Sequence, residues 1–289
     1  MRDWFDIHSN DNALFTTAMC SNRCLMCCQP PQKKDDIDSL WGKNIHLIET
    51  APKELPSIGI TGGEPTLLGD HFFELIHHIR EMLPETEIHI LSNGRAFSDK
   101  TFTAKLSEIG PEKILLGIPL HSDNQPDHDF IAGSKGAYTE TLLGLYNLAR
   151  WSMDIELRVV LTKLNYKRLP QLAHFIYRNL PFVRYVSLMG LEYTGYTIKN
   201  AAQVWIDPVE MAQPLSEATR FLASAGLNVS IFNLTQCVLP EIIWPYARKS
   251  ISDWKNRYEP FCEYCRVKNK CCGLFSTSIK HSSSLHPIV

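Results

Sequence analysis

The sequence predicts an α/β fold in which strands and helices alternate, and three observations support this. Short apolar runs recur between segments whose apolar residues stand three or four positions apart. The chain has 289 residues, which suits one large domain or one barrel with a small appendage. The alternation occupies about 190 residues, fewer than the ~250 of a complete eightfold barrel. We therefore expect a partial (β/α)6 barrel of the TIM type, with a small cysteine-rich extension at its C-terminal end.

The alternation gives six strands and the helices between them. The expected strands cover residues 13–19, 57–61, 87–91, 113–120, 155–162 and 184–189. The expected helices cover residues 36–50, 72–83, 98–109, 134–151 and 169–180. Further on, Asp207 and Pro208 predict the N-cap and first residue of a helix to about residue 225, and residues 228–233 predict a short strand. In such a fold the site is built from the loops after the strands.

Composition and charge exclude several classes of protein. A net charge of −2 gives no sign of a nucleic-acid or acidic-membrane partner. No run approaches the ~18 apolar residues of a membrane span, and residues 1–12 lack the apolar centre of a signal peptide. Nine cysteines gather at 20–28, 237 and 262–272, which favours metal binding in a reducing cytoplasm over disulfides.

Three cysteines follow the first expected strand at spacings of three and two residues, namely Cys20, Cys24 and Cys27. Thiolates suit zinc or iron–sulfur clusters, and structural zinc or a ferredoxin cluster takes four ligands. Cys28 is too close to Cys27 to be an easy fourth ligand, and we expect it to stay a free thiol. Three ligands leave one iron of a cluster open, as a catalytic metal needs. The alternatives are a zinc knuckle or a few buried cysteines.

The cysteine segment and a second motif together resemble the radical S-adenosylmethionine (SAM) superfamily. The second motif, at residues 61–66, reads Thr-Gly-Gly-Glu-Pro-Thr and follows the second expected strand. Met26 stands where the superfamily usually has an aromatic residue, and it is also bulky and apolar enough to shield a cluster. The resemblance implies a partial barrel and a [4Fe–4S] cluster on Cys20, Cys24 and Cys27, with SAM bound at the open iron.

The resemblance also implies where SAM binds. In the superfamily the turn formed by Gly62, Gly63, Glu64 and Pro65 meets the amino group of SAM. Glycines permit a close backbone approach, and Pro65 holds Glu64 extended. The alternative is a strand-to-helix turn without a ligand.

Arg158 lies in an apolar strand, where a guanidinium needs an anionic partner. A comparable arginine in radical SAM enzymes with appended clusters faces the carboxylate of SAM, and the alternative is an ion pair with Glu156 or Glu192. The superfamily often has Ser and Asp on the fourth strand, whereas this chain has Pro119 and His121 there. Ser122 and His121 are the candidates for contact with the ribose of SAM. The remaining expected SAM contacts are Ser92, Asn93 and Met189.

Three cysteines near the C-terminal end are spaced C-x2-C-x5-C, namely Cys262, Cys265 and Cys271. This spacing resembles the SPASM/Twitch extensions, which hold auxiliary iron–sulfur clusters. The position of a further cysteine in the two-cluster form is Phe275, so we expect one auxiliary cluster. Cys237 brings the set to four thiolates, enough for one closed [4Fe–4S] site. Tetrahedral zinc on the same four residues is the alternative, and Cys272 could replace Cys271.

We expect residues 1–195 to form the radical SAM core, residues 196–275 the SPASM/Twitch-like extension, and residues 276–289 a flexible tail. Five segments resemble more narrowly the HxsC maturases of the His-Xaa-Ser repeat peptide system: residues 27–31, 118–122, 128–129, 188–192 and 251–256. This resemblance implies a His-Xaa-Ser repeat peptide as substrate and a second radical SAM maturase as partner.

The implied function is that of a radical SAM oxidoreductase or maturase. Reductive cleavage of SAM gives a 5′-deoxyadenosyl radical that takes hydrogen from a ribosomally made peptide, with an electron donor such as flavodoxin or ferredoxin. The cofactor carries the hard chemistry, and the protein binds and orients. The alternatives are another protein-modifying maturase of the sulfatase type and a non-catalytic metal-binding scaffold. Neither nucleic acid nor membrane is expected as a partner.

Overall fold

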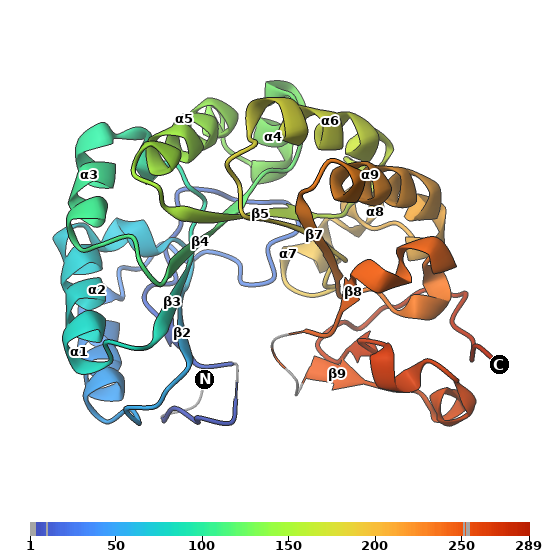
Figure 1. Ribbon diagram of the computed structural model, residues 1–289, viewed down its shortest axis with the longest axis horizontal. Helices are drawn as coiled ribbons and strands as arrows, with labels where there is room; N and C mark the ends of the chain where they lie inside the picture. The colour runs from blue at the N-terminus through green and yellow to red at the C-terminus, as the bar shows by residue number, and fades with distance from the viewer. Residues whose placement is uncertain (1–3, 10, 251, 253–254) are drawn as a thin grey trace. The chain divides into compact units, whose positions relative to one another are not determined.

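The computed structural model describes residues 4–9, 11–250, 252 and 255–289 (Figure 1). The chain divides into two compact units. The first unit consists of Met1–Arg23, Gln29–Pro119 and Gly136–Glu156, and the second consists of Cys24–Cys28, Leu120–Lys135 and Leu157–Val289. The first cysteine segment therefore contributes Cys20 to the first unit and Cys24 and Cys27 to the second.

Four parallel strands form the sheet of the first unit: β1 (Ala13–Phe15), β2 (Ser57–Thr61), β3 (Glu87–Leu91) and β4 (Ile114–Pro119). Its helices are α1 (Ile37–Glu49), α2 (Asp70–Met82), α3 (Lys100–Glu108) and α5 (Ala137–Arg150). Figure 1 shows α1, α2 and α3 along one side of β2 and β3. Alternate residues of β2 and β3, such as Ile58 and Ile88, are fully buried and form the core against these helices.

The second unit continues the same pattern. β5 (Asp154–Val160) enters this unit at Leu157, and β6 (Tyr185–Met189), β7 (Asn228–Phe232) and β8 (Ala247–Arg248) are parallel. Its helices are α4 (Gln125–Ala132), α6 (Leu169–Asn179), α7 (Tyr196–Lys199), α8 (Ala201–Val204) and α9 (Ala212–Ser224). The neighbouring helices α6 and α9 pack together, with the rings of His174 and Phe221 3.8 Å apart. β9 (Asn256–Arg257) and β10 (Leu274–Phe275) form a separate antiparallel pair.

The predicted parallel α/β architecture is confirmed within each unit, since β1 to β4 of the first and β6 to β8 of the second are parallel neighbours in chain order. Among the described residues, β7 and β8 continue the parallel strands beyond the six that were expected. β7 was expected only as a short strand of the extension, but it pairs with β6 along its whole length and buries Val229 and Ile231. β8 was not anticipated, because two residues carry no periodic pattern.

The first strand is shorter than predicted. β1 ends at Phe15, whereas the expected strand ran to residue 19. The backbone leaves the sheet because the carboxylate of Asp36 accepts hydrogen bonds from the Thr17 hydroxyl, at 2.6 Å, and the Ala18 N–H, at 2.9 Å. This change of direction frees the following residues to form the cysteine segment.

Capping residues begin both α4, which was not predicted, and the helical segment after Asp207, which was predicted. α4 was not predicted, although Asn124 caps it by accepting from the Asp127 N–H at 3.0 Å, with a proline in the first turn. The predicted cap at Asp207 is confirmed: its carboxylate accepts from the Val209 N–H and opens a 3-10 turn that leads into α9.

Residues 276–289 were expected to be flexible, and the structure gives them several hydrogen bonds. The Ile279 N–H donates to the Tyr193 carbonyl, and the Ser282 hydroxyl donates to the Asp207 carboxylate. The expected boundaries at residues 195 and 275 stay predictions. None of the described helices is long and apolar enough to cross a lipid bilayer.

Candidate functional site

The turn after β2 packs against the backbone that leads into the cysteine segment. The Gly63 N–H donates to the Thr17 carbonyl at 2.6 Å, and the Glu64 N–H donates to the Met19 carbonyl at 2.8 Å. A Cβ atom would lie 2.5 Å from the Thr17 oxygen if placed on Gly62, and 2.0 Å from the Met19 oxygen if placed on Gly63. The glycines are therefore needed for a close approach within the chain itself, and their contact with a ligand stays a prediction.

Glu64 joins this turn to the end of β3. Its carboxylate is 1% exposed and accepts four hydrogen bonds, from the Thr66 N–H and hydroxyl, the Ser92 hydroxyl at 2.7 Å and the Asn93 N–H at 2.6 Å. Burial raises the pKa of Glu64, and these hydrogen bonds act in the opposite direction. Glu64 is extended before Pro65, as predicted. The carboxylate thus fixes two loops relative to each other within the first unit.

Asn93 extends this network to the first cysteine. Its side-chain amide donates to the Ser21 hydroxyl at 2.8 Å and lies 3.9 Å from the Cys20 sulfur. The Asn22 N–H also points at that sulfur, at 3.4 Å. Burial raises the pKa of the Cys20 thiol, and these two donors oppose the shift by favouring the thiolate. Ser92 and Asn93 therefore support the cysteine segment in this structure.

Arg95 is a supporting residue that sequence reasoning missed. Its guanidinium donates to the Asn22 side chain at 2.7 Å and to the Ser21 carbonyl at 3.1 Å, and it pairs with Glu140 at 2.5 Å. Only its position two residues after Asn93 could have pointed to it, because its partners are more than forty residues away in sequence.

The second half of the cysteine segment is fixed within the second unit. The Leu25 N–H donates to the Ile131 carbonyl, the Tyr196 N–H donates to the Cys27 carbonyl, and Met26 packs against Ile131 in an apolar cluster. Gly195 has a φ of +55°, and a Cβ atom there would lie 2.4 Å from the Cys27 oxygen. This glycine was not singled out from the sequence, because nothing local marks it as a neighbour of the cysteines.

Arg158 and Met189, both expected to contact SAM, contact each other. Two guanidinium nitrogens of Arg158 lie 3.3 and 3.2 Å from the Met189 sulfur. Glu156, an alternative partner, instead lies 3.0 Å from a ring nitrogen of His89. Within the described part of the chain Arg158 has no ion pair with a carboxylate, so its charge remains suited to an anionic ligand.

The end of β4 presents a buried imidazole. His121 is 2% exposed, and neither of its ring nitrogens has a hydrogen-bond partner among the described residues. Burial and the neighbouring His128 hold the pKa of His121 well below its usual range, so the ring is neutral. The Ser122 hydroxyl, in contrast, accepts from the Asn124 side chain at 3.1 Å. His121 therefore has more free hydrogen-bonding capacity than Ser122.

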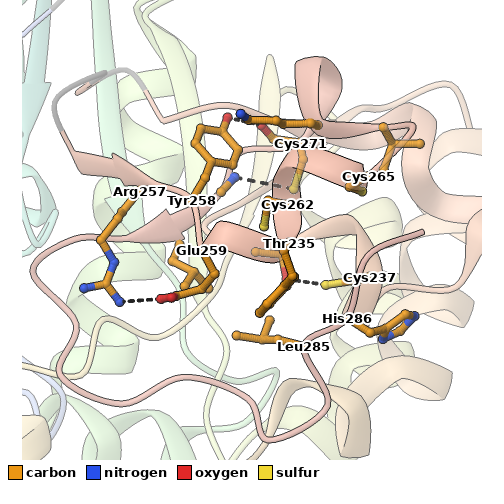
Figure 2. Close-up of a pocket in the computed structure, with 15 residues that line it drawn as sticks. Thr235, Cys237, Arg257, Tyr258, Glu259, Cys262, Cys265, Cys271, Leu285 and His286 are labelled. Carbon is orange, nitrogen blue, oxygen red and sulfur yellow. Dashed lines mark hydrogen bonds and ion pairs between the residues drawn. The ribbon is translucent and has the colours of Figure 1, made fainter. Parts of the chain in front are cut away.

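The four C-terminal cysteines that were predicted as ligands line one pocket (Figure 2): Cys237, Cys262, Cys265 and Cys271. Cys237 lies in one 3-10 turn, Cys262 and Cys265 lie in and directly after a second, and Cys271 directly follows a third. None of them is in a disulfide. Cys272 does not line this pocket, since its sulfur lies 3.1 Å from the Gly273 carbonyl oxygen. The structure thus places Cys271, not Cys272, at the pocket.

The arrangement of these thiols bears on the kind of metal group they could hold. Among the described residues, no three His, Cys, Asp or Glu side chains converge closely enough to hold one metal ion. One zinc ion needs four sulfurs at ~2.3 Å from a single point, whereas a four-iron cluster offers a separate iron to each thiolate. Both groups would use the same four thiolates, so the zinc alternative stays open at this pocket.

The lowered pKa of the Cys271 thiol favours the thiolate, the form in which cysteine binds a metal. A hydrogen bond from Cys272 lowers the pKa of the Cys271 thiol to about 6, and the N–H groups of Gln236 and Gly273 assist against the effect of burial. We expect the metal-free chain to carry a thiolate at pH 7, whose ultraviolet absorbance disappears as the pH falls through about 6. The Cys271→Ser variant should lack this step. A titration in which every thiol ionises near the ordinary value of ~8.5 would contradict the assignment.

The family model described as the Radical SAM superfamily matches residues 14–176 of this chain. A curated relative, the Fe-coproporphyrin III synthase of Methanosarcina barkeri (strain Fusaro / DSM 804), is 26% identical over 157 residues, which are 53% of this chain and 37% of that protein. The chain thus matches little more than a third of that relative's length.

Solved structures share the fold. Streptococcus suis SuiB bound to S-adenosylmethionine superimposes with a TM-score of 0.60 at 17% identity, over 84% of this chain and 54% of SuiB. SuiB bound to its precursor peptide SuiA superimposes with a TM-score of 0.58 at 15% identity, over 81% of this chain and 50% of SuiB. The structure of anSMEcpe with bound AdoMet and the Kp18Cys peptide superimposes with a TM-score of 0.57 at 17% identity, over 76% of this chain and 62% of anSMEcpe. At these identities the similarity concerns the fold alone.

Proposed function

Since the chain belongs to the radical SAM superfamily, we propose that it is a maturase that modifies a ribosomally made peptide by radical chemistry. One observation carries the proposal: the segment with Cys20, Cys24 and Cys27 is fixed at both ends. Its beginning is hydrogen-bonded to the Gly-Gly turn, and its end to the residue that follows Gly195. Such support is expected where ligand positions must be held accurately.

The residues present fit the cofactors that the family implies, a [4Fe–4S] cluster and SAM. The three cysteines are free of disulfides and only partly buried, and the open coordination site left by three ligands suits SAM. When bound, these cofactors supply the reductive cleavage of SAM and the hydrogen abstraction. The Asn93 amide and the Asn22 N–H stabilise the Cys20 thiolate, and Met26 keeps water from the other end of the segment.

The proposed SAM contacts are those expected from the sequence, and His121 is the first candidate for contact with the ribose. We assign the carboxylate of SAM to Arg158, whose guanidinium has no competing carboxylate among the described residues. His121 offers two unpartnered ring nitrogens to the ribose hydroxyls. The other proposed contacts are Gly62, Gly63, Glu64, Pro65, Ser92, Asn93, Ser122 and Met189.

The proposal includes one auxiliary [4Fe–4S] cluster held by the four thiols of the C-terminal pocket (Figure 2). It would accept an electron from the substrate or shape the peptide site. The finer proposal for the substrate is a His-Xaa-Ser repeat peptide, with a second radical SAM maturase and a flavodoxin or ferredoxin as partners. SuiB, which shares the fold, has been solved with a precursor peptide. This supports a peptide as substrate, without favouring the His-Xaa-Ser repeat peptide over other peptides.

A second candidate substrate class is a tetrapyrrole. It is favoured by the sequence match to an Fe-coproporphyrin III synthase, which covers 53% of this chain. The peptide proposal comes first because of the cysteines that line the C-terminal pocket. Their spacing in the sequence resembles that of the SPASM/Twitch extensions of peptide maturases.

The test is anaerobic reconstitution followed by two measurements. Iron, sulfide and zinc are counted per chain, and 5′-deoxyadenosine is quantified after adding a reductant and SAM. The proposal expects about eight irons, no zinc, and more 5′-deoxyadenosine with a His-Xaa-Ser peptide than with its scrambled control, together with a changed peptide mass. About four irons with one zinc would make the C-terminal site structural. Stimulation by a tetrapyrrole alone would favour the second candidate, and little iron without 5′-deoxyadenosine would overturn the radical mechanism.

A further inference from the structure

Residues 285–288 lie against the cysteine pocket. Leu285 and His286 line it together with the four thiols (Figure 2). The Ile288 N–H points at the Cys265 sulfur, with 3.4 Å between nitrogen and sulfur. The Arg266 N–H in turn donates to the Ile288 carbonyl at 2.8 Å. The segment is thus bonded through both its N–H and its C=O to the turn that carries one of the proposed cluster ligands.

A second anchor holds the chain just before this segment. The Asp207 carboxylate accepts from the Ser282 hydroxyl at 2.5 Å and from both the N–H and the hydroxyl of Ser283 at 3.0 Å. Burial raises the pKa of Asp207, but these hydrogen bonds outweigh it and bring the pKa below its usual range. The group is therefore ionised near neutral pH, and its hydrogen bonds are of the stronger, charge-assisted kind.

The chain between the two anchors brings Leu285 and His286 to the pocket. Leu285, Pro287 and Ile288 are all half-buried, while Val289 beyond them is 89% exposed. The stability and reduction potential of a metal cluster depend on solvent access and on hydrogen bonds to its sulfurs. At the pocket this segment provides the apolar Leu285 side chain, the His286 ring and one such hydrogen bond from the Ile288 N–H.

We propose that residues 285–288 form the closing wall of the auxiliary cluster pocket, and that the Ile288 N–H raises the cluster's reduction potential through Cys265. The inference rests on the proposed auxiliary cluster. An N–H donor favours the more negative, reduced cluster, because it stabilises charge on the thiolate sulfur. The wall also limits the access of water, oxygen and chelators.

The first experiment tests the wall. It uses the full chain with Cys20, Cys24 and Cys27 changed to alanine, so that the iron which remains is auxiliary. In that background, a chain ending at Ser284 should lose its iron to a chelator on the order of tenfold faster. The matched control ends at Ile288 and removes only the exposed Val289, so its rate should equal that of the parent.

The second experiment tests the hydrogen bond without removing the wall. Ile288→Pro deletes the N–H donor, whereas Ile288→Ala shortens the side chain and keeps the donor. We expect a lower reduction potential in the proline variant than in the alanine variant, measured by a redox titration followed by electron paramagnetic resonance. A chelation rate close to that of the parent would show that the segment remains docked in both variants.

The outcomes separate this inference from the function on which it rests. A parent chain with zinc or no metal in the pocket would overturn the auxiliary cluster itself. Iron in the parent with equal chelation rates in the parent and the chain ending at Ser284 would overturn the wall alone. Equal potentials in the proline and alanine variants would overturn the tuning role. The variant pair stays informative even if the shortened chain does not fold.

Discussion

Replacing Gly63 with alanine is expected to remove the iron bound by Cys20, Cys24 and Cys27 and to leave the iron of the C-terminal pocket in place. The new Cβ would lie 2.0 Å from the Met19 carbonyl oxygen, a backbone atom that cannot rotate away. Overpacking of this kind costs about 1–3 kcal/mol, and we place this contact at the upper end. The strain falls on the residue next to Cys20, so the first ligand is displaced.

The measurement is the iron count per chain after anaerobic reconstitution, which should fall from about eight to about four. Gly42→Ala is the matched control, because nothing lies within 4 Å of the Cβ it would add in α1. This control should keep all its iron and gain roughly 0.5–1 kcal/mol in the free energy of unfolding, as glycine is unfavourable inside a helix. A Gly63→Ala chain with unchanged iron would show that the turn does not position the cysteine segment.

Replacing Glu64 with glutamine is expected to lower 5′-deoxyadenosine formation at least about tenfold and the free energy of unfolding by about 3 kcal/mol. The buried carboxylate accepts from four donors on Thr66, Ser92 and Asn93. An amide has only one acceptor oxygen and brings its own N–H donors against at least one of these groups. A buried donor left without a partner costs about 1–3 kcal/mol.

Activity and stability should fall together, because Asn93 connects Glu64 to Ser21 and Cys20. Denaturant unfolding and the yield of 5′-deoxyadenosine measure the two effects. Glu54→Gln, the same substitution at an exposed position, is the control and should change neither quantity. Loss of activity at full stability and full iron content would instead indicate that the Glu64 carboxylate acts on the cofactor directly.

Local signals in the sequence were enough for much of the fold. β2 and β3 lie where the apolar runs predict them, and α9 follows the cap at Asp207. These elements depend on residues close together in sequence, since hydrophobic periodicity and capping act over a few positions. The missed α4 carried a similar local signal at Asn124.

The sequence by itself determined the family and predicted the two sets of cysteine ligands, because ligand spacing and the Gly-Gly-Glu-Pro turn are local patterns. Only the tertiary structure decided which groups support them. It showed that Gly63 approaches the Met19 carbonyl, that the buried Glu64 accepts from the Asn93 N–H just after β3, and that the Ile288 N–H points at Cys265. These contacts join residues between 23 and 44 positions apart, and no local pattern encodes them. They arise because packing brings backbone groups together and buried polar groups must then find partners.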